Sequence, residues 1–186
     1  VDFEATCDEP TPPGYTPEII EFPVVVVDTR DRRIVSEFQS FVRPAEKPVL
    51  SAFCMELTGI TQDDVTAAPP LQTVVNRFDR WLSGIIPEGK SFIFATDGPY
   101  DMCDFMYEYG VKTYGVQFPE YFYRWIDIKE AFSDFFGCRH GKIHAMLDHF
   151  GLTFEGRLHS GIDDARNIAR IALALLDAGC TFPTVD

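Results

Sequence analysis

The segment I-I-E-F-P-V-V-V-V-D, residues Ile19–Asp28, predicts a buried β-strand, because four consecutive β-branched valines follow Pro23. A short charged turn comes next, at residues 28–33. Residues 33–42 then alternate between the two faces of a second strand, and residues 1–6 show the same alternation at the start of the chain. Three consecutive strands are therefore expected before any helix.

Helix and strand signals alternate through the rest of the chain. Ser51 can cap a short helix that ends at Gly59, and Thr61, with Asp64 three residues later, resembles a capping box for another. The remaining expected elements are a helix over residues 71–82, a strand over 91–95, helices over 100–109, 127–136, 142–150 and 162–178, and an ambiguous aromatic segment at 118–126. A strand meander followed by this alternation predicts an α/β fold, a mixed sheet flanked by helices. The lack of internal repeats favours one domain over residues 1–186.

Composition limits the classes of function. The chain has 186 residues, of which 46% are hydrophobic, enough to bury one sizeable core. Its 16 Lys and Arg stand against 29 Asp and Glu, which gives a net charge of −13. This charge argues against a protein that coats the backbone of a long nucleic acid with cations. A polyanionic substrate would need another source of positive charge.

The cysteines indicate the compartment. They are odd in number, widely spaced and without a C-x-x-C pair, so neither a disulfide framework nor a zinc site is expected, and an intracellular compartment, cytoplasm or nucleus, fits best. The five are Cys7, Cys54, Cys103, Cys138 and Cys180. No apolar run reaches the roughly 20 residues of a membrane span, and no basic-then-apolar leader opens the chain, so no membrane association is expected. The chain opens directly on a strand-like segment, so we expect upstream residues in a longer protein.

Two acids lie close together on the first predicted strand. Asp2 and Glu4 are two residues apart, so their side chains project from the same face and can share one cation. This spacing is common in an acidic chain, and a solvated strand face is the alternative. The apolar residues between and beside them mark a core strand, where two unpartnered acids would be costly.

Two further acidic motifs stand at the starts of predicted helices. Asp97 and Asp101 flank a strand-to-helix turn, where an acid can also serve as a turn or capping residue. H-S-G-I-D-D, residues 159–164, is a loop that leads into a helix, and either Asp163 or Asp164 could cap that helix. The remaining histidines lack such a setting and are interpreted as surface or core residues; they are His140, His144 and His149.

Together these groups fit a two-metal phosphodiesterase site. Several carboxylates would hold two divalent ions about 3.5–4 Å apart, and the ions would clamp the scissile phosphate. A histidine that is neutral near pH 7 could take the proton from the attacking water. The hard oxygen ligands favour Mg²⁺ or Mn²⁺ over zinc. An acidic protein could then act on a polyanion because the metals supply the positive charge.

Three segments resemble the motifs of a known enzyme family. D-F-E-A-T-C (residues 2–7), A-T-D-G-P-Y-D-M (95–102) and H-S-G-I-D-D-A-R-N-I-A (159–169) resemble the three exonuclease motifs of the DEDDh, or DnaQ-like, 3′→5′ exonucleases. More narrowly, they resemble the enhanced-RNAi type, which includes the histone-mRNA 3′-end exoribonuclease. The resemblance spans nearly the whole chain. It implies a ribonuclease-H-like fold, with a five-stranded mixed sheet flanked by helices.

The resemblance also assigns roles to single residues. It implies Asp2, Glu4, Asp101 and Asp164 as the metal ligands and Glu4 and His159 as the catalytic residues, with His159 as general base. The preference for Asp101 over Asp97, and for Asp164 over Asp163, comes from this resemblance and not from spacing. The residues expected to hold the terminal nucleotide, together with His159, are Phe3, Ala5, Met55, Leu57 and Thr58.

The implied activity is that of a metal-dependent 3′→5′ exoribonuclease. It would act on single-stranded or overhanging RNA 3′ ends and release nucleoside 5′-monophosphates. Two alternatives stay open: a DNA exonuclease with the same site, and a catalytically silent RNA-binding or adaptor domain. The sequence predicts no particular protein partner.

Overall fold

The first three strands form an antiparallel sheet in the order β1-β2-β3, as the alternation predicts. They are β1 (Glu4–Ala5), β2 (Ile19–Asp28) and β3 (Arg33–Phe41). The structure is a computed structural model and describes residues 1–139 and 141–182. The first strand is shorter than the six residues expected from the sequence.

Pro23 explains why β1 is short. The Ile20 carbonyl oxygen accepts a hydrogen bond from the Val42 backbone N–H, on the β3 side of β2. Backbone polar groups of successive residues point to opposite sides of a strand, so those of Glu21 and Pro23 point toward β1. Glu21 pairs with Glu4, and Pro23 would come next, but proline has no N–H to donate. The ladder therefore ends at Glu4, and the segment before it is free to follow another path.

The two remaining strands form a separate parallel pair, β4 (Phe94–Thr96) with β5 (Trp125–Asp127). One hydrogen bond connects the two groups of strands, since the backbone nitrogen of Val1 donates to the carbonyl oxygen of Ala95 at 3.0 Å. The expected five-stranded mixed sheet is thus present as three strands plus two. The strand expected at residues 91–95 begins later, and the ambiguous segment at 118–126 ends in β5.

Local capping signals located two of the helices. The Ser51 side chain accepts from the backbone N–H of Cys54, and Gly59 ends that helix in the left-handed conformation at φ 76°. Thr61 and Asp64 form the expected capping box. The α-helices are α1 (Ala52–Thr58), α2 (Gln62–Ala67), α3 (Leu71–Ile85), α4 (Ile128–Phe136), α5 (Ile143–His149) and α6 (Gly161–Asp177).

One helix differs from the sequence prediction in both length and type. The helix expected over residues 100–109 runs over Tyr100–Thr113 as a π-helix, η1, and at its end Tyr114 donates to Tyr109 in the i→i+5 pattern. Gly110 does not stop it, because the glycine lies buried under the Phe118 ring. A short 3₁₀-helix, η2 (Glu120–Tyr123), precedes β5.

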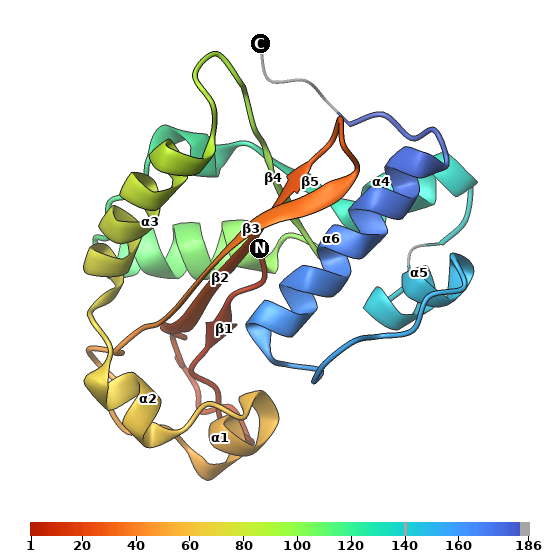
Figure 1. The fold of residues 1–186 in the computed structure, drawn as a ribbon. Coiled ribbons are helices and arrows are strands. Elements are labelled where there is room, and N and C mark those ends of the chain that lie inside the picture. Colours follow the sequence, from red (N-terminus) through yellow and green to blue (C-terminus); the bar gives the residue numbers. More distant parts are fainter. Residues whose placement is uncertain (140, 183–186) are drawn as a thin grey trace.

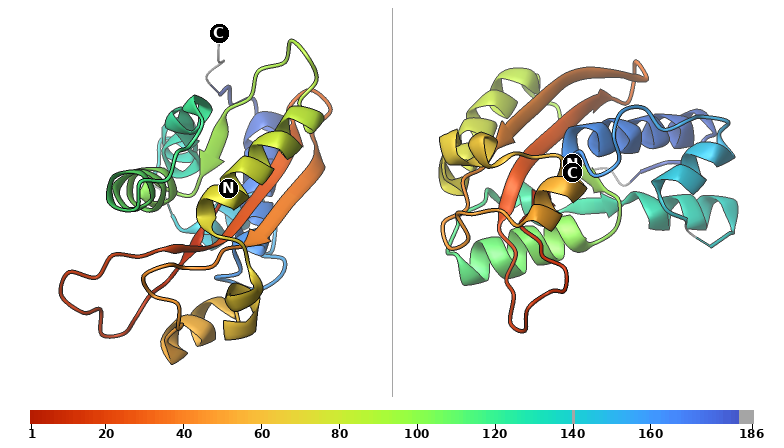
Figure 2. Two further views of the ribbon diagram at one scale, coloured as in Figure 1. Left: turned by 90° about the vertical axis from the view of Figure 1, so that its left-hand side faces the viewer. Right: turned by 90° about the horizontal axis from the view of Figure 1, so that it is seen from below.

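The helices cover both faces of the sheet. α6 lies against one face and η1 against the other, with α3 along the side of β3 (Figures 1 and 2). A phenylalanine-rich core cluster around Phe22 fills the space between the sheet, α3 and η1, and a second cluster joins α6 to α4 and α5. Within the described ranges, no helix is both long and apolar enough to cross a bilayer. The start of α6 lies beside the β1 segment, because Gly161 packs against the Asp2 backbone and donates to Glu21 on β2.

Candidate active site

Four acids from three distant parts of the chain converge beside β1. Asp2 and Glu4 come from the β1 segment, Asp101 from the first turn of η1, and Asp164 from the first turn of α6. Burial raises the pKa of Asp2 well above its ordinary value, and the charges of the other three acids raise it further. The acids therefore face one another.

Asp101 is held by the strand segment itself. Its carboxylate is only 5% exposed and accepts a hydrogen bond from the Phe3 backbone N–H. Burial raises the pKa of Asp101 to about 6. Asp97, the alternative acid, forms an ion pair with Lys129 at 3.2 Å, although its charge also acts to raise the Asp101 pKa. Asp101 is therefore in direct contact with the β1 segment through Phe3.

Asp164 and its neighbour Asp163 point to different partners. Asp164 is 3% exposed, and its Oδ2 accepts from the His159 backbone N–H at 2.8 Å. Burial raises the Asp164 pKa to about 7. Its Oδ1 is buried and has no hydrogen-bond partner in the described part of the chain. Asp163 instead accepts from the Arg157 backbone N–H and pairs with Arg166, each at 3.0 Å.

Glu4, His159 and Asp164 lie close enough to bind one metal ion. One potential ligand atom from each lies within 4.8 Å of the others. The pKa of Glu4 is raised to about 9, chiefly by burial and then by the charge of Asp164. The two carboxylates disfavour each other's ionised form, and Asp164 has a buried oxygen without a hydrogen bond in the described part of the chain. A divalent cation between them would stabilise both ionised forms. The residues present thus fit divalent metal binding.

His159 is suited to accept a proton. It is exposed and has a left-handed backbone conformation, φ 61°. Desolvation lowers its pKa, and the positive charges of Arg157 and Lys142 lower it further. The imidazole is therefore neutral near pH 7.

The expected nucleotide-binding residues differ in how much of each side chain is exposed. Met55 and Leu57 are half-buried on α1, so their side chains can reach a ligand. Phe3 and Ala5 are buried, and the Thr58 hydroxyl is committed to the Cys54 carbonyl oxygen at 2.8 Å. Only the backbone of these three is available without rearrangement.

The other histidines are structural where the chain is described. The His144 ring stacks on Phe154 with 4.9 Å between centroids, and His149 packs against Phe136 at 4.2 Å. His140 lies outside the described residues.

Two residues of the site were missed in the sequence. Glu21 is buried, and its carboxylate accepts from Gln39 at 2.7 Å and from the Gly161 backbone N–H at 3.1 Å, so it anchors the start of α6. An acid inside an apolar strand was the available signal. Arg157 donates to the Glu56 carbonyl oxygen at 2.7 Å and so connects the His159 loop to α1. No sequence signal indicated that long-range contact.

A two-part mixed sheet with helices on both faces and an acid cluster beside its first strand defines a ribonuclease-H-like protein of the exonuclease class. The chain belongs to the exonuclease (RNase_T) family, since residues 1–172 match the sequence model of that family. The resemblance to DEDDh exonucleases seen in the three motifs is thereby confirmed.

Named relatives and solved structures agree with this placement. The chain is 38% identical over 183 residues to 3′-5′ exoribonuclease 1 of Rattus norvegicus, covering 97% of this chain and 53% of the relative. The nuclease domain of 3′hExo, a DEDDh family member bound to rAMP, superposes with a TM-score of 0.91 at 38% identity, covering 96% of this chain and 90% of that one. A 3′-exonuclease solved for 3′-end recognition of a histone mRNA stem-loop gives 0.89 at 37%, covering 96% and 80%. The chain spans about half the length of the first-named curated relative and its mammalian counterparts.

Proposed function

We propose that this chain is a metal-dependent 3′→5′ exoribonuclease domain that removes nucleoside 5′-monophosphates from single-stranded or overhanging RNA 3′ ends. The observation that carries the proposal is the convergence of Glu4, His159 and Asp164 within 4.8 Å, beside Asp2 and Asp101. RNA is favoured because the relatives are named exoribonucleases and one structural neighbour was solved with rAMP.

Asp2, Glu4, Asp101 and Asp164 would hold two divalent cations, Mg²⁺ or Mn²⁺, through hard carboxylate oxygens. When bound, such ions stabilise the attacking and leaving oxygens of a phosphodiester displacement. The raised pKa values of these acids follow from burial and from one another's charge, so cation binding would favour their ionised forms.

His159 would act as the general base. Its neutral imidazole accepts a proton from a water molecule as the water oxygen attacks the terminal phosphorus and the bond to the preceding O3′ breaks. The hydrogen bond from its backbone to Asp164 keeps the base in register with the acid cluster. The positive charge that His159 gains would be offset by the neighbouring carboxylates.

The walls of the site would come from α1 and the β1 segment. Met55 and Leu57 offer half-buried apolar side chains to a base or sugar, and the β1 segment contributes Asp2 and Glu4. With a net charge of −13, the grip would be confined to a few terminal nucleotides near the cations, so the salt dependence of binding would be weak.

The test follows a 5′-labelled single-stranded RNA in Mg²⁺. Asp101→Asn, His159→Ala and Asp164→Asn should each slow trimming by about 10²-fold or more. Asp163→Asn is the matched control, since Asp163 adjoins Asp164 in sequence but pairs with Arg166, and it should stay within severalfold of wild type. Unchanged rates in the first three variants would refute the site assignment.

Substrate class needs its own comparison. RNA and DNA oligonucleotides of one sequence should be trimmed at different rates, RNA faster, if a contact to the 2′-OH is made. A faster rate on DNA would favour the DNA exonuclease alternative. Binding of Mn²⁺ and RNA without any cleavage would favour the adaptor alternative.

A further inference from the structure

Two cysteines that the proposed chemistry does not use lie close together where β1 meets α1. Ser51 bridges the backbones of Cys7 and Cys54, and each cysteine shifts the pKa of the other. Cys54 is fully buried in an apolar cluster with Ile20 and Leu50, and Cys7 packs against that cluster. Both cysteines are free, as are the other three.

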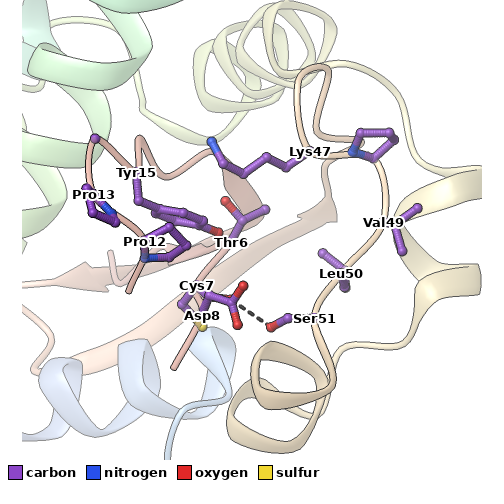
Figure 3. A pocket seen from close by; sticks show the side chains of 12 residues that line it. Thr6, Cys7, Asp8, Pro12, Pro13, Tyr15, Lys47, Val49, Leu50 and Ser51 are labelled. Carbon is purple, nitrogen blue, oxygen red and sulfur yellow. Dashed lines mark hydrogen bonds between the residues drawn. The ribbon is translucent and has the colours of Figure 1, made fainter. Parts of the chain in front are cut away.

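The backbones that carry the two cysteines are tied together. Ser51 donates its hydroxyl to the Cys7 carbonyl oxygen at 2.8 Å and accepts from the Cys54 backbone N–H at 3.0 Å. The Cys54 sulfur also lies 3.8 Å from the Ala5 carbonyl oxygen. Figure 3 shows Ser51 facing Cys7, with the first of these bonds dashed. Ser51 thus holds the two cysteines near each other, and a disulfide would require their sulfur atoms to come into bonding distance.

Solvent reaches this pair from one side. A pocket of about 540 Å³ is lined by Cys7, Tyr15 and Ser51 among others, and Cys7 is half-buried at its wall (Figure 3). Cys54 lies behind Cys7. The neighbouring Cys7 lowers the pKa of the Cys54 thiol to about 7, while Cys54 and burial raise the pKa of Cys7, so Cys54 is the one of the two that loses its proton more readily.

We propose that Cys7 and Cys54 are a modification site, a reversible disulfide that forms under peroxide and restrains α1. Its effect on catalysis rests on the proposed function; its formation does not. Transient disulfides of this kind are the usual form in reducing compartments.

The chemistry balances with hydrogen peroxide as the two-electron oxidant. The Cys7 sulfur attacks one peroxide oxygen while its proton passes to Cys54, which gives a sulfenic acid and hydroxide. The Cys54 sulfur then attacks the Cys7 sulfur, the S–OH bond breaks, and the departing hydroxide leaves as water with the Cys54 proton. The thiol–thiolate pair loses two electrons, and the peroxide becomes one water and one hydroxide, which takes a proton from the solvent. A thiol reductant reverses the bond by exchange.

The disulfide would act on the proposed nucleotide wall through α1. An S–S bond of about 2.05 Å is much shorter than a contact between two unbonded sulfur atoms, so the first turn of α1 must move toward the segment that carries Cys7. Met55 follows Cys54 directly, and Leu57 lies one turn further along the same helix. A displacement of about 1 Å can cost about 10²-fold in rate, so a loss of at least about tenfold in kcat/KM is expected.

The experiment uses the full chain with Cys103→Ser and Cys138→Ser as background, which removes the two exposed thiols. After treatment with hydrogen peroxide, intact mass should fall by about 2 Da, and a non-reduced peptide map should join the peptides that contain Cys7 and Cys54. RNA trimming should fall in parallel and return with dithiothreitol.

Cys7→Ser is the principal control, since Cys7 is only half-buried, and Cys54→Ala is the second. Both should form no cross-link and keep their trimming rate in peroxide. Absence of the Cys7–Cys54 peptide in the parent would overturn the site, and a cross-linked protein with an unchanged rate would overturn its effect on α1. If the reduced parent protein trims no RNA, the proposed function is refuted. The peptide map would still show whether the Cys7–Cys54 disulfide forms.

Discussion

Replacing Gly161 by alanine should damage the site and the fold together. Gly161 begins α6, and a Cβ built there would lie 2.6 Å from the Asp2 carbonyl oxygen, 3.0 Å from Pro23 Cγ and 3.1 Å from a Glu21 carboxylate oxygen. The nearest of these is backbone, which cannot turn aside as a flexible side chain could. The helix and the β1 segment would have to separate, and Asp164 would move with the helix.

The size of the effect follows from the contact distances. Ordinary Cβ contacts begin near 3.4 Å, so the first turn of α6 must retreat by about 0.8 Å. Overpacking on this scale costs about 1–3 kcal/mol of unfolding free energy. Because the retreat separates Asp164 from Asp2, RNA trimming should slow by about ten- to a hundredfold.

Gly84→Ala provides the matched control. Gly84 is also helical, in α3, but no heavy atom lies within 4 Å of the position that its Cβ would take. This variant should gain about 0.5–1 kcal/mol, because alanine is the better helix former, and should trim RNA at the wild-type rate. Urea unfolding and the RNA assay measure both variants. A Gly161→Ala protein as stable and as active as wild type would refute the close packing of α6 on the β1 segment.

Four further predictions concern charge and packing. The pKa of Asp164 is about 7 in the folded protein against an ordinary 3.8, so the stability it contributes is full below pH about 4 and is lost as the pH rises through about 7. Without metal, the Tm of Asp164→Asn should therefore exceed that of wild type by more at pH 8 than at pH 5. An equal difference at both pH values would contradict the raised pKa. Mn²⁺ should raise the wild-type Tm more at pH 8 than at pH 5 for the same reason. Glu18 accepts backbone hydrogen bonds from residues 45–47 at 2.6–3.0 Å, so Glu18→Ala should lower the unfolding free energy in urea by about 2–3 kcal/mol. A loss below about 0.5 kcal/mol, which is typical of ordinary surface substitutions, would show that water replaces these hydrogen bonds. Phe22 is fully buried, with Phe3 and Phe78 rings at 4.8 and 5.3 Å, so Phe22→Ala should cost about 3–5 kcal/mol, and a small loss would mean that the cluster collapses to fill the space.

The fold was predictable wherever its signals are local. The valine run gave β2, and the Ser51 and Thr61 caps located two helices, because capping depends on residues three positions apart. The end of η1 was not predictable, because Gly110 does not take up the left-handed conformation that would end a helix there and instead lies buried under the Phe118 ring.

The site shows the same division. Spacing placed Asp2 and Glu4 on one face, but it left Asp97 and Asp101 equivalent, because only tertiary contact with Phe3 distinguishes them. The family motifs supplied that choice. Glu21 stayed hidden because its partner, Gly161, is 140 residues away in the chain.

Pro23 also protects the chain against misfolding. A strand that slips by one residue turns all its side chains to the opposite face, so a slipped β1 would turn Asp2 and Glu4 away from Asp164. Two-residue strands have few side-chain contacts with which to correct such an error. Pro23 closes the ladder at a fixed point, since any pairing extended past Glu21 would meet a backbone nitrogen that cannot donate. The residue that interrupts the sheet thereby disfavours slips that would move Glu4 toward Pro23.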